Sequence, residues 1–369
     1  MSDKKRVAWL DSLRVLASFF VIISHFSYVA AESPTVHDFL QKYIFNIGGL
    51  GVTFFFAISG YLAANSLKYS TSVKEFYRRK VIRIIIPYVA AYIVFGAIFS
   101  ILALIEPSLN AHSPLHFFNE TGNFLAIIIG MLPIEVNFLY YFKIQNFGII
   151  GEWFIGTIII IYLLAPLLKF LMNKNPFLPY VLSLLSIYLV GPYLVSLQEQ
   201  GIIITAVGLF FVRIPEFLLG MILYQCKDKI DKFPAKIVIS VFLVFSIYNL
   251  IYSESISIVG KLANSIGFWG FEFAALLWVW VIYIFLQWLN EHFEKILKPF
   301  NNFSNISYMA MLIHHIIIHS LNDLFHFETF GFGKMFLFLL LTIFLTVVLS
   351  KFIHLIYKPI EEKLIRMKS

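Results

Sequence analysis

The sequence predicts an all-α membrane protein, a polytopic bundle of about ten transmembrane helices with both termini in the cytoplasm. Composition, the length of the apolar runs and the placement of basic residues all lead to this class. Hydrophobic residues make up 60% of the 369 residues and charged ones only 13%, against roughly 25% charged in ordinary soluble domains. A soluble domain of this length could not bury so much apolar surface in one core, so lipid must solvate most of it.

Apolar runs long enough to span a bilayer recur along the whole chain. A transmembrane helix needs about 20 apolar residues, with a range of roughly 17 to 25. Runs of this length occupy residues 8–30, 48–67, 81–105, 151–171, 178–197, 202–224, 235–252, 266–289, 305–322 and 335–357. Helices are expected because the alternating pattern of a membrane β-barrel is absent. We therefore expect one membrane domain over residues 1–369.

The basic residues set the orientation of these spans. Most of the 28 Lys and Arg residues fall in one set of loops. The opposite loops hold only Lys42, Lys143, Lys261 and Lys334. The positive-inside rule then places the basic loops and both termini in the cytoplasm. Because the basic clusters lie between apolar runs and not along one soluble face, nucleic acid is not an expected partner.

Residues 106–149 contain an apolar stretch that does not read as a full span. The stretch at 124–141 is interrupted by Pro133 and Glu135. We expect 106–149 to form an extracytoplasmic loop with a re-entrant or interfacial segment. A full span there would reverse the orientation of every later helix.

Arg14 and His25 share one face of the first predicted helix. They are eleven residues apart, which returns to nearly the same face, roughly 16 Å further along the axis. A charged side chain at mid-helix costs about 3 kcal/mol on insertion scales and usually serves a site. We expect both side chains to face one enclosed cavity. The structural alternatives are a snorkelling Arg and a bundle His with satisfied hydrogen bonds.

The other polar residues within the runs sort into two layers. The inner layer holds Arg14, Lys80 and Arg83. Glu152 and Glu272 lie towards the outer side, with His314 and His315 near mid-membrane and His319 above them. A basic inner layer suits an anionic ligand, because Lys and Arg pair well with phosphate. An outer His with carboxylates suits general-base work on a hydroxyl.

Several further polar residues have weaker interpretations. His315 and His319 could bind a metal with the outer carboxylates, but without an HExxH motif or a Cys ligand we expect no metal. Arg213 and Glu216 are interpreted as a buried structural pair. Ser59 could hydrogen-bond in the site or let helices pack closely, and Trp153 could belong to the site or to the interfacial aromatic belt.

Six segments carry a more specific signal when taken in order. They are WLDSLRVLASFFVIISHF (9–26), GVTFFFAISGYLAANSL (51–67), FYRRKVIRIIIPY (76–88), GEWFIGTIIIIYLLAPLL (151–168), RIPEFLLGMILY (213–224) and ISYMAMLIHHIII (306–318). Together they resemble the acyltransferase-3 family of integral membrane acyltransferases. The first carries that family's Arg-x10-His signature at Arg14 and His25.

The resemblance implies a membrane O-acyltransferase. Such enzymes move an acyl group, usually acetyl, from cytoplasmic acyl-CoA to a hydroxyl of an extracytoplasmic glycan or related, lipid-linked acceptor. His25 would be the general base or an acyl relay, and we expect Arg14 and Glu152 to act with it. Arg14, Lys80 and Arg83 would hold the phosphates of acyl-CoA. The family's Arg-x-x-Arg motif reads Lys80 and Arg83 here, so Arg79 could supply the missing bidentate guanidinium.

The expected setting is the bacterial cytoplasmic membrane. The chain to Ser369 shows no soluble hydrolase-like domain, so it would complete the transfer itself or hand the acyl group to a separate partner protein. The alternative function is a transporter or flippase of a lipid-linked glycan. Intramembrane His and Arg also occur in transporters, and interrupted helices can line a transport path, but the two halves show no inverted repeat.

Overall fold

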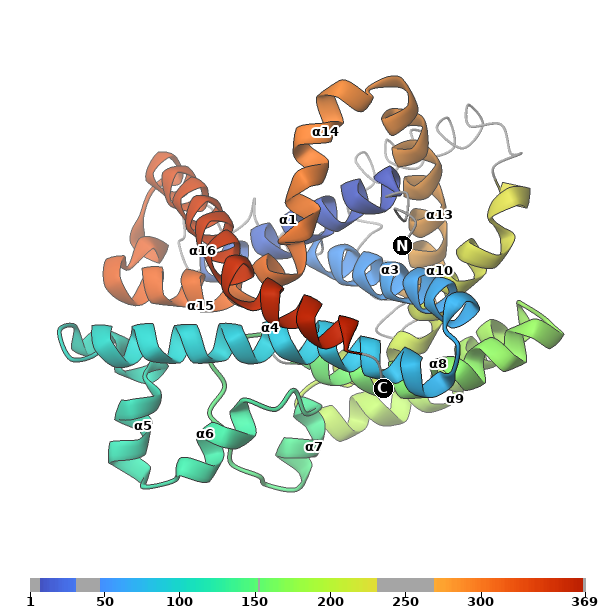
Figure 1. Ribbon diagram of the computed structural model, residues 1–369. Helices are drawn as coiled ribbons and strands as arrows, with labels where there is room; N and C mark the ends of the chain where they lie inside the picture. The colour runs from blue at the N-terminus through green and yellow to red at the C-terminus, as the bar shows by residue number, and fades with distance from the viewer. Residues whose placement is uncertain (1–6, 31–46, 152, 231–268, 368–369) are drawn as a thin grey trace. The chain divides into compact units, whose positions relative to one another are not determined.

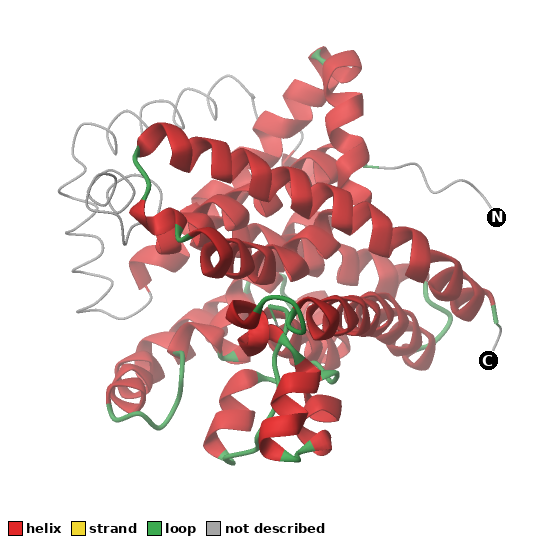
Figure 2. Cartoon of the chain, turned by 90° about the vertical axis from the view of Figure 1, so that its left-hand side faces the viewer, coloured by secondary structure: helices red, strands yellow, loops and turns green. Residues whose placement is uncertain are grey.

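The computed structural model describes residues 7–30, 47–151, 153–230 and 269–367. Within these residues the regular secondary structure is helical throughout, as Figure 2 shows with helices in red and loops in green. The predicted all-α class is therefore confirmed. The predicted run at 235–252 lies outside the described residues.

The long helices follow the predicted apolar runs (Figure 1). They are α1 (Ala8–Ala30), α3 (Ile47–Tyr69), α4 (Val73–Leu102), α8 (Trp153–Lys174), α9 (Leu178–Glu199), α10 (Phe210–Ile230), α13 (Trp269–His292), α15 (Ser307–Phe325) and α16 (Phe332–Arg366). Shorter helices are α5 (Pro114–Thr121), α6 (Phe124–Gly130), α7 (Val136–Tyr141) and α14 (Glu294–Asn302). Short 3-10 helices are η1 (Pro107–His112), η2 (Ala206–Gly208), η3 (Phe303–Asn305) and η4 (Phe327–Thr329).

The chain is a multi-pass membrane protein. Among the described helices, six are long and apolar enough to cross a membrane, namely α1, α3, α4, α8, α9 and α16. Only helices satisfy all backbone hydrogen bonds within one spanning segment. The total of ten spans and the cytoplasmic placement of both termini stay predictions.

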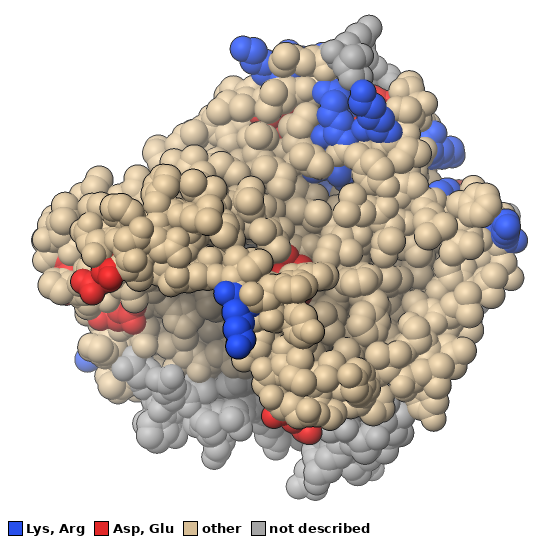
Figure 3. Space-filling view, turned by 90° about the horizontal axis from the view of Figure 1, so that it is seen from below, with Lys and Arg blue, Asp and Glu red and all other residues tan. Residues whose placement is uncertain are grey.

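Apolar side chains are exposed on the outward faces of these helices. Leu189 on α9 is 68% exposed, and Leu355 on α16 is 72% exposed. On the face of the molecule in Figure 3, tan atoms dominate and charged side chains are sparse. Such a surface is unfavourable in water and is suited to hydrocarbon.

The chain folds as two compact units whose segments alternate along the sequence. Unit 1 comprises Met1–Ala17, Val52–Val73 and Ile158–Ser304, and unit 2 comprises Ser18–Gly51, Lys74–Thr157 and Asn305–Ser369. Boundaries between the units therefore fall inside α1, α3, α8 and η3, and after the first residue of α4. The prediction of one membrane domain over the whole chain is not tested by this division.

In unit 1, α3 and α10 make backbone contact at two glycines. A Cβ added at Gly60 would lie 1.8 Å from the carbonyl oxygen of Phe217. One added at Gly220 would lie 1.7 Å from the carbonyl oxygen of Ala57. No side chain fits at such distances, so only glycine allows this approach.

A buried charge pair lies beside this helix crossing. Arg213 Nη1 donates to Glu216 Oε1 at 2.8 Å, and Thr53 Oγ1 on α3 donates to the same oxygen at 2.6 Å. The Arg213 guanidinium carbon also lies 5.6 Å from the ring centre of Phe56. This geometry supports the interpretation of Arg213 and Glu216 as a structural pair that joins α3 to α10.

In unit 2, the segment between α4 and α8 folds back along α4 (Figure 1). Its helices α6 and α7 have 7 and 6 residues, too short to cross a bilayer. Tyr88 donates to the Gly130 carbonyl at 2.9 Å, and Tyr92 donates to the Phe147 carbonyl at 2.7 Å. The C-terminal half of α4 thus donates hydrogen bonds to backbone carbonyls that have no partner within this irregular segment.

Glu135 anchors the turn between α6 and α7. Its carboxyl accepts the backbone N–H of Phe138 at 3.1 Å and the side-chain amide of Asn137 at 3.0 Å. Burial raises the pKa of the Glu135 carboxyl, and these hydrogen bonds oppose that rise. The placement of residues 106–149 on the extracytoplasmic side stays a prediction.

Candidate active site

Helix α1 carries both residues of the predicted signature, but they belong to different units. Arg14 lies in unit 1 and His25 in unit 2. The cavity predicted to contain both side chains therefore stays a prediction.

In unit 1, Arg14 is paired with an acidic side chain of its own helix. Arg14 Nη1 donates to Asp11 Oδ1 at 3.0 Å, and Ser304 Oγ donates to the same oxygen at 2.9 Å. The Arg14 side chain is 27% exposed, whereas that of Asp11 is only 7% exposed. An anionic ligand at Arg14 would therefore share the guanidinium with Asp11.

A neighbouring amide network was not predicted from the sequence. Asn290 Nδ2 donates to Ser12 Oγ at 2.9 Å, Ser12 Oγ donates to Asn301 Oδ1 at 2.6 Å, and Asn301 Nδ2 donates to Asn290 Oδ1 at 2.8 Å. This closed ring of hydrogen bonds joins the start of α1 to α13 and α14. The only signal in the sequence is the polarity of these residues at the ends of apolar runs.

In unit 2, α1 and α15 bring the predicted histidines together. The ring centroid of His25 lies 4.9 Å from that of His314 and 4.9 Å from that of His315. His319, one turn along α15 from His315, has its ring centroid 4.4 Å from that ring. These four side chains are called the histidine cluster below.

Burial distinguishes the members of the histidine cluster. His314 is 3% exposed, whereas His25, His315 and His319 are half-buried. A half-buried imidazole can meet a substrate and exchange protons with it. His25, His315 and His319 are therefore suited to acid–base work, while His314 is closed off from a substrate.

A further histidine contact at the end of α15 was missed. His112 Nε2 of η1 lies 2.7 Å from Asp323 Oδ2. This contact links the segment after α4 to α15, close to His319 in the sequence. His112 lies outside every predicted span and forms no motif, so nothing in the sequence indicated it.

The basic residues predicted to hold acyl-CoA lie near the start of α4 and already have protein partners. Arg79 forms an ion pair with Glu75. Lys80 Nζ lies 5.7 Å from the ring centre of Phe76. Arg83, 56% exposed, has its Nε 4.0 Å from Glu361 on α16. Arg83 is thus the most accessible of the three to an anion.

Arg78, next to these residues, has a structural role. Its guanidinium donates to the carbonyl oxygens of Leu364 and Met367, both at 2.9 Å. These carbonyls belong to the C-terminal end of α16, which lacks intrahelical donors. Arg78 therefore caps α16 and joins it to α4.

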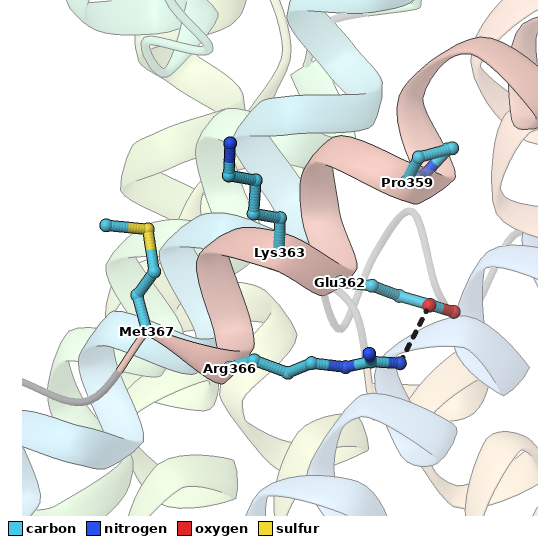
Figure 4. A pocket seen from close by; sticks show the side chains of 5 residues that line it. All are labelled: Pro359, Glu362, Lys363, Arg366 and Met367. Carbon is cyan, nitrogen blue, oxygen red and sulfur yellow. Dashed lines mark hydrogen bonds and ion pairs between the residues drawn. The ribbon is translucent and has the colours of Figure 1, made fainter.

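A surface cavity of about 450 Å³ lies at this same end of α16 (Figure 4). Its lining side chains are Pro359, Glu362, Lys363, Arg366 and Met367. The dashed line in Figure 4 joins Arg366 to Glu362 at 3.4 Å. The cavity is lined by one helix alone and contains none of the predicted site residues, so we assign it no catalytic role.

The remaining predicted site residues are scattered or outside the described part. Ser59 lies half-buried on α3 in unit 1, and Trp153 begins α8 in unit 2. Glu152 lies outside the described residues. Glu272 belongs to α13, but its side chain lies outside the described part of the chain.

Metal binding is another chemistry open to a cluster of histidines. In the part of the chain that the structure describes, no group of three His, Cys, Asp or Glu side chains is arranged to hold a metal ion. The expectation that the protein needs no metal stays a prediction.

Comparison with known families bears out the resemblance seen in the sequence. The family model described as an acyltransferase domain, that of the acyltransferase-3 family, matches residues 7–354. Comparisons with curated proteins and with solved structures gave no match. The match covers α1 through most of α16 and includes every residue of the histidine cluster. The chain therefore belongs to the acyltransferase-3 family and is a membrane acyltransferase.

Proposed function

We propose that this protein moves an acyl group, usually acetyl in this family, from cytoplasmic acyl-CoA to a hydroxyl of an extracytoplasmic glycan or lipid-linked acceptor. The observation that carries the proposal is the histidine cluster, in which the half-buried His25 lies 4.9 Å, ring to ring, from two histidines of α15. Hydroxyl acylation needs a base near neutral pH, and imidazole is the side chain suited to that task.

His25 serves as the general base. It takes the proton of the acceptor hydroxyl as the oxygen attacks the acyl carbonyl carbon of the thioester. The carbon–sulfur bond then breaks, and the CoA thiolate takes up a proton. An alternative within the same proposal is that His25 carries the acyl group itself before the acceptor receives it.

Arg14, Arg79, Lys80 and Arg83 supply the charge that attracts acyl-CoA. Phosphate groups prefer guanidinium partners, which bind two oxygens at once. Two of these arginines lie beside carboxylates, Arg14 beside Asp11 and Arg79 beside Glu75. A phosphate bound at either arginine would therefore share the guanidinium with the carboxylate already beside it.

Glu152 adjoins Trp153 at the start of α8, and we propose that it assists His25. The layer of outer carboxylates and histidines expected from the sequence is the basis for this role. Ser59 and Glu272 remain candidates for contacts with the acyl chain or the acceptor.

The experiment that tests this function follows a labelled acyl group. Membrane vesicles containing the full-length protein receive [¹⁴C]acetyl-CoA together with the glycan and glycolipid fraction of the native cells. Covalent label on that fraction, absent from vesicles without the protein, is the expected result. Movement of a lipid-linked glycan across the membrane without any transferred label would instead identify a flippase and overturn the proposal.

A further inference from the structure

His314 is the buried member of the histidine cluster, and its hydrogen bonding fixes which nitrogen carries the proton. Its Nδ1 lies 3.2 Å from the carbonyl oxygen of Ala310, one turn earlier on α15. A carbonyl oxygen can only accept, so Nδ1 is the donor. In the neutral ring Nε2 is then a lone-pair acceptor.

This accepting nitrogen is buried without a donor. The His314 side chain lies almost wholly inside the protein, and its Nε2 has no hydrogen-bond partner among the residues that the structure describes. Buried polar atoms in native proteins are nearly always paired, and an exception points to strain, catalysis or an absent ligand. The acceptor at His314 is therefore open to a donor from a neighbouring side chain.

His25 is placed to supply that donor. The two rings have centroids 4.9 Å apart and planes at 66°. A centroid separation of this size allows a hydrogen bond of about 2.7–3.2 Å when a nitrogen of His25 points at His314 Nε2, and because Ala310 holds the His314 ring, it is the His25 ring that would turn. His315 lies equally close to His25, but it is half-buried, so water can serve its nitrogens.

We propose that His314 is a positioning residue for His25, and that its buried Nε2 accepts an N–H of His25 while the other His25 nitrogen faces the acyl acceptor. Such a pair fixes the tautomer and the orientation of the base, as a third group does in other nucleophile–base arrangements. The inference rests on the proposed acyl transfer.

The role of the pair is clearest in the charged intermediate. The acceptor hydroxyl oxygen bonds to the acyl carbon, and its proton passes to His25. His25 is then an imidazolium whose N–H is donated to His314 Nε2, and a hydrogen bond from a charged donor is stronger than one from a neutral donor. When the carbon–sulfur bond breaks, the CoA thiolate takes the proton from His25, and both imidazoles return to the neutral state.

The variants that test this role remove the hydrogen-bonding groups at Nδ1 and Nε2 of His314 one at a time or together. His314→Asn keeps a donor near Nδ1 for Ala310 but removes the acceptor at Nε2. His314→Gln places a carbonyl oxygen near Nε2, and His314→Leu removes both groups. The matched control is His292→Asn, because His292 makes the same bond to the carbonyl one turn earlier, Nδ1 to Trp288 oxygen at 2.8 Å, in an exposed position on α13.

The measurement is acetyl transfer from [¹⁴C]acetyl-CoA to the glycan and glycolipid fraction, with kcat and KM for the donor determined per folded protein. We expect kcat of His314→Asn to fall roughly 10- to 100-fold, the range for loss of a hydrogen bond to a charged group. The KM for acetyl-CoA should change by less than about two-fold, because the bond strengthens only as charge develops. His314→Gln should exceed both His314→Asn and His314→Leu, and His292→Asn should match the wild type.

Equal kcat values for the Gln and Leu variants would overturn the inference, because an accepting atom would then make no difference. A folded His314→Asn protein with wild-type kcat would do the same. Either result leaves acyl transfer by the wild type intact. A wild-type protein that transfers no label overturns the proposed function, and the inference falls with it.

Discussion

Buried charges in the described part of this chain are paired with side chains close by in the sequence. Arg14 pairs with Asp11 and Arg213 pairs with Glu216, each three residues apart on one helix. Such pairs face the same side of a helix and can form as soon as the helix does. Removal of one partner leaves the other charged and buried. We therefore expect such substitutions to lower the free energy of unfolding most.

Glu216→Leu is predicted to destabilise the protein by about 3–5 kcal/mol, because Arg213 would be left buried without its carboxylate. Thermal unfolding in detergent measures the effect. The control is Glu199→Leu, an exposed position at the end of α9 in the same unit, which should leave the melting temperature unchanged. A double variant, Arg213→Met with Glu216→Leu, should recover much of the loss. No difference between Glu216→Leu and wild type would contradict the pairing.

Glu361→Gln is predicted to strengthen the use of acyl-CoA. Glu361 lies 4.0 Å from Arg83 Nε and 3.0 Å from Lys358 Nζ, so its charge competes with the phosphates. The Glu361 side chain is only 9% exposed, but both of its cations are exposed; pairs with an exposed partner are worth about 0.2–1 kcal/mol, which corresponds to a fall in the KM for acetyl-CoA of about 1.4- to 5-fold. Glu362→Gln, whose partner is Arg366, is the control. A higher KM in Glu361→Gln would show that Arg83 does not serve the donor.

At the scale of helices, the crossing of α3 and α10 depends on glycine. Gly60→Ala is predicted to push the two helices apart, because the new Cβ would meet backbone atoms of Phe217 that cannot move aside. Overpacking typically costs about 1–3 kcal/mol, and a backbone collision belongs at the upper end. Gly333→Ala on α16 is the control, since a Cβ there has nothing within 4 Å. Equal melting temperatures for the two variants would contradict the close crossing.

The sequence predicted the helices well where a run is uniformly apolar and less well at their ends. The predicted run 8–30 has the same limits as α1. In contrast, α10 begins at Phe210, well inside the predicted run 202–224. The difference arises because Gly201 adopts a left-handed φ of 68° and η2 follows it. Hydropathy does not distinguish an apolar turn from the first turn of a helix.

The sequence predicted which residues belong to the candidate site, but it did not predict which of them are in contact. His25, His314 and His315 stand out because lipid should exclude them. Nothing in their spacing shows that α1 lies against α15, since that contact joins positions almost 300 residues apart in the chain. The Asn290 network and the His112–Asp323 pair were missed for the same reason.

For the whole molecule, the prediction concerns membrane topology, that is, which side of the membrane each loop faces. The single cysteine, Cys226 on α10, is predicted to face the cytoplasm. A membrane-impermeant maleimide should therefore leave Cys226 unlabelled in intact cells and label it in inverted vesicles. In a Cys226→Ser background, Thr121→Cys in the α5 segment should show the opposite pattern. Labelling of Cys226 from outside would reverse the predicted orientation.

The central claim is that His25 performs acyl transfer, and it is tested most directly with the His25→Ala protein. The rate of [¹⁴C]acetyl transfer to the glycan and glycolipid fraction is measured for wild type, His25→Ala and the control His116→Ala in α5. We expect His25→Ala to insert and fold normally yet to lose about 10²- to 10⁴-fold in rate, the usual contribution of a general base, while His116→Ala keeps the wild-type rate. Near-normal transfer by folded His25→Ala would contradict the account.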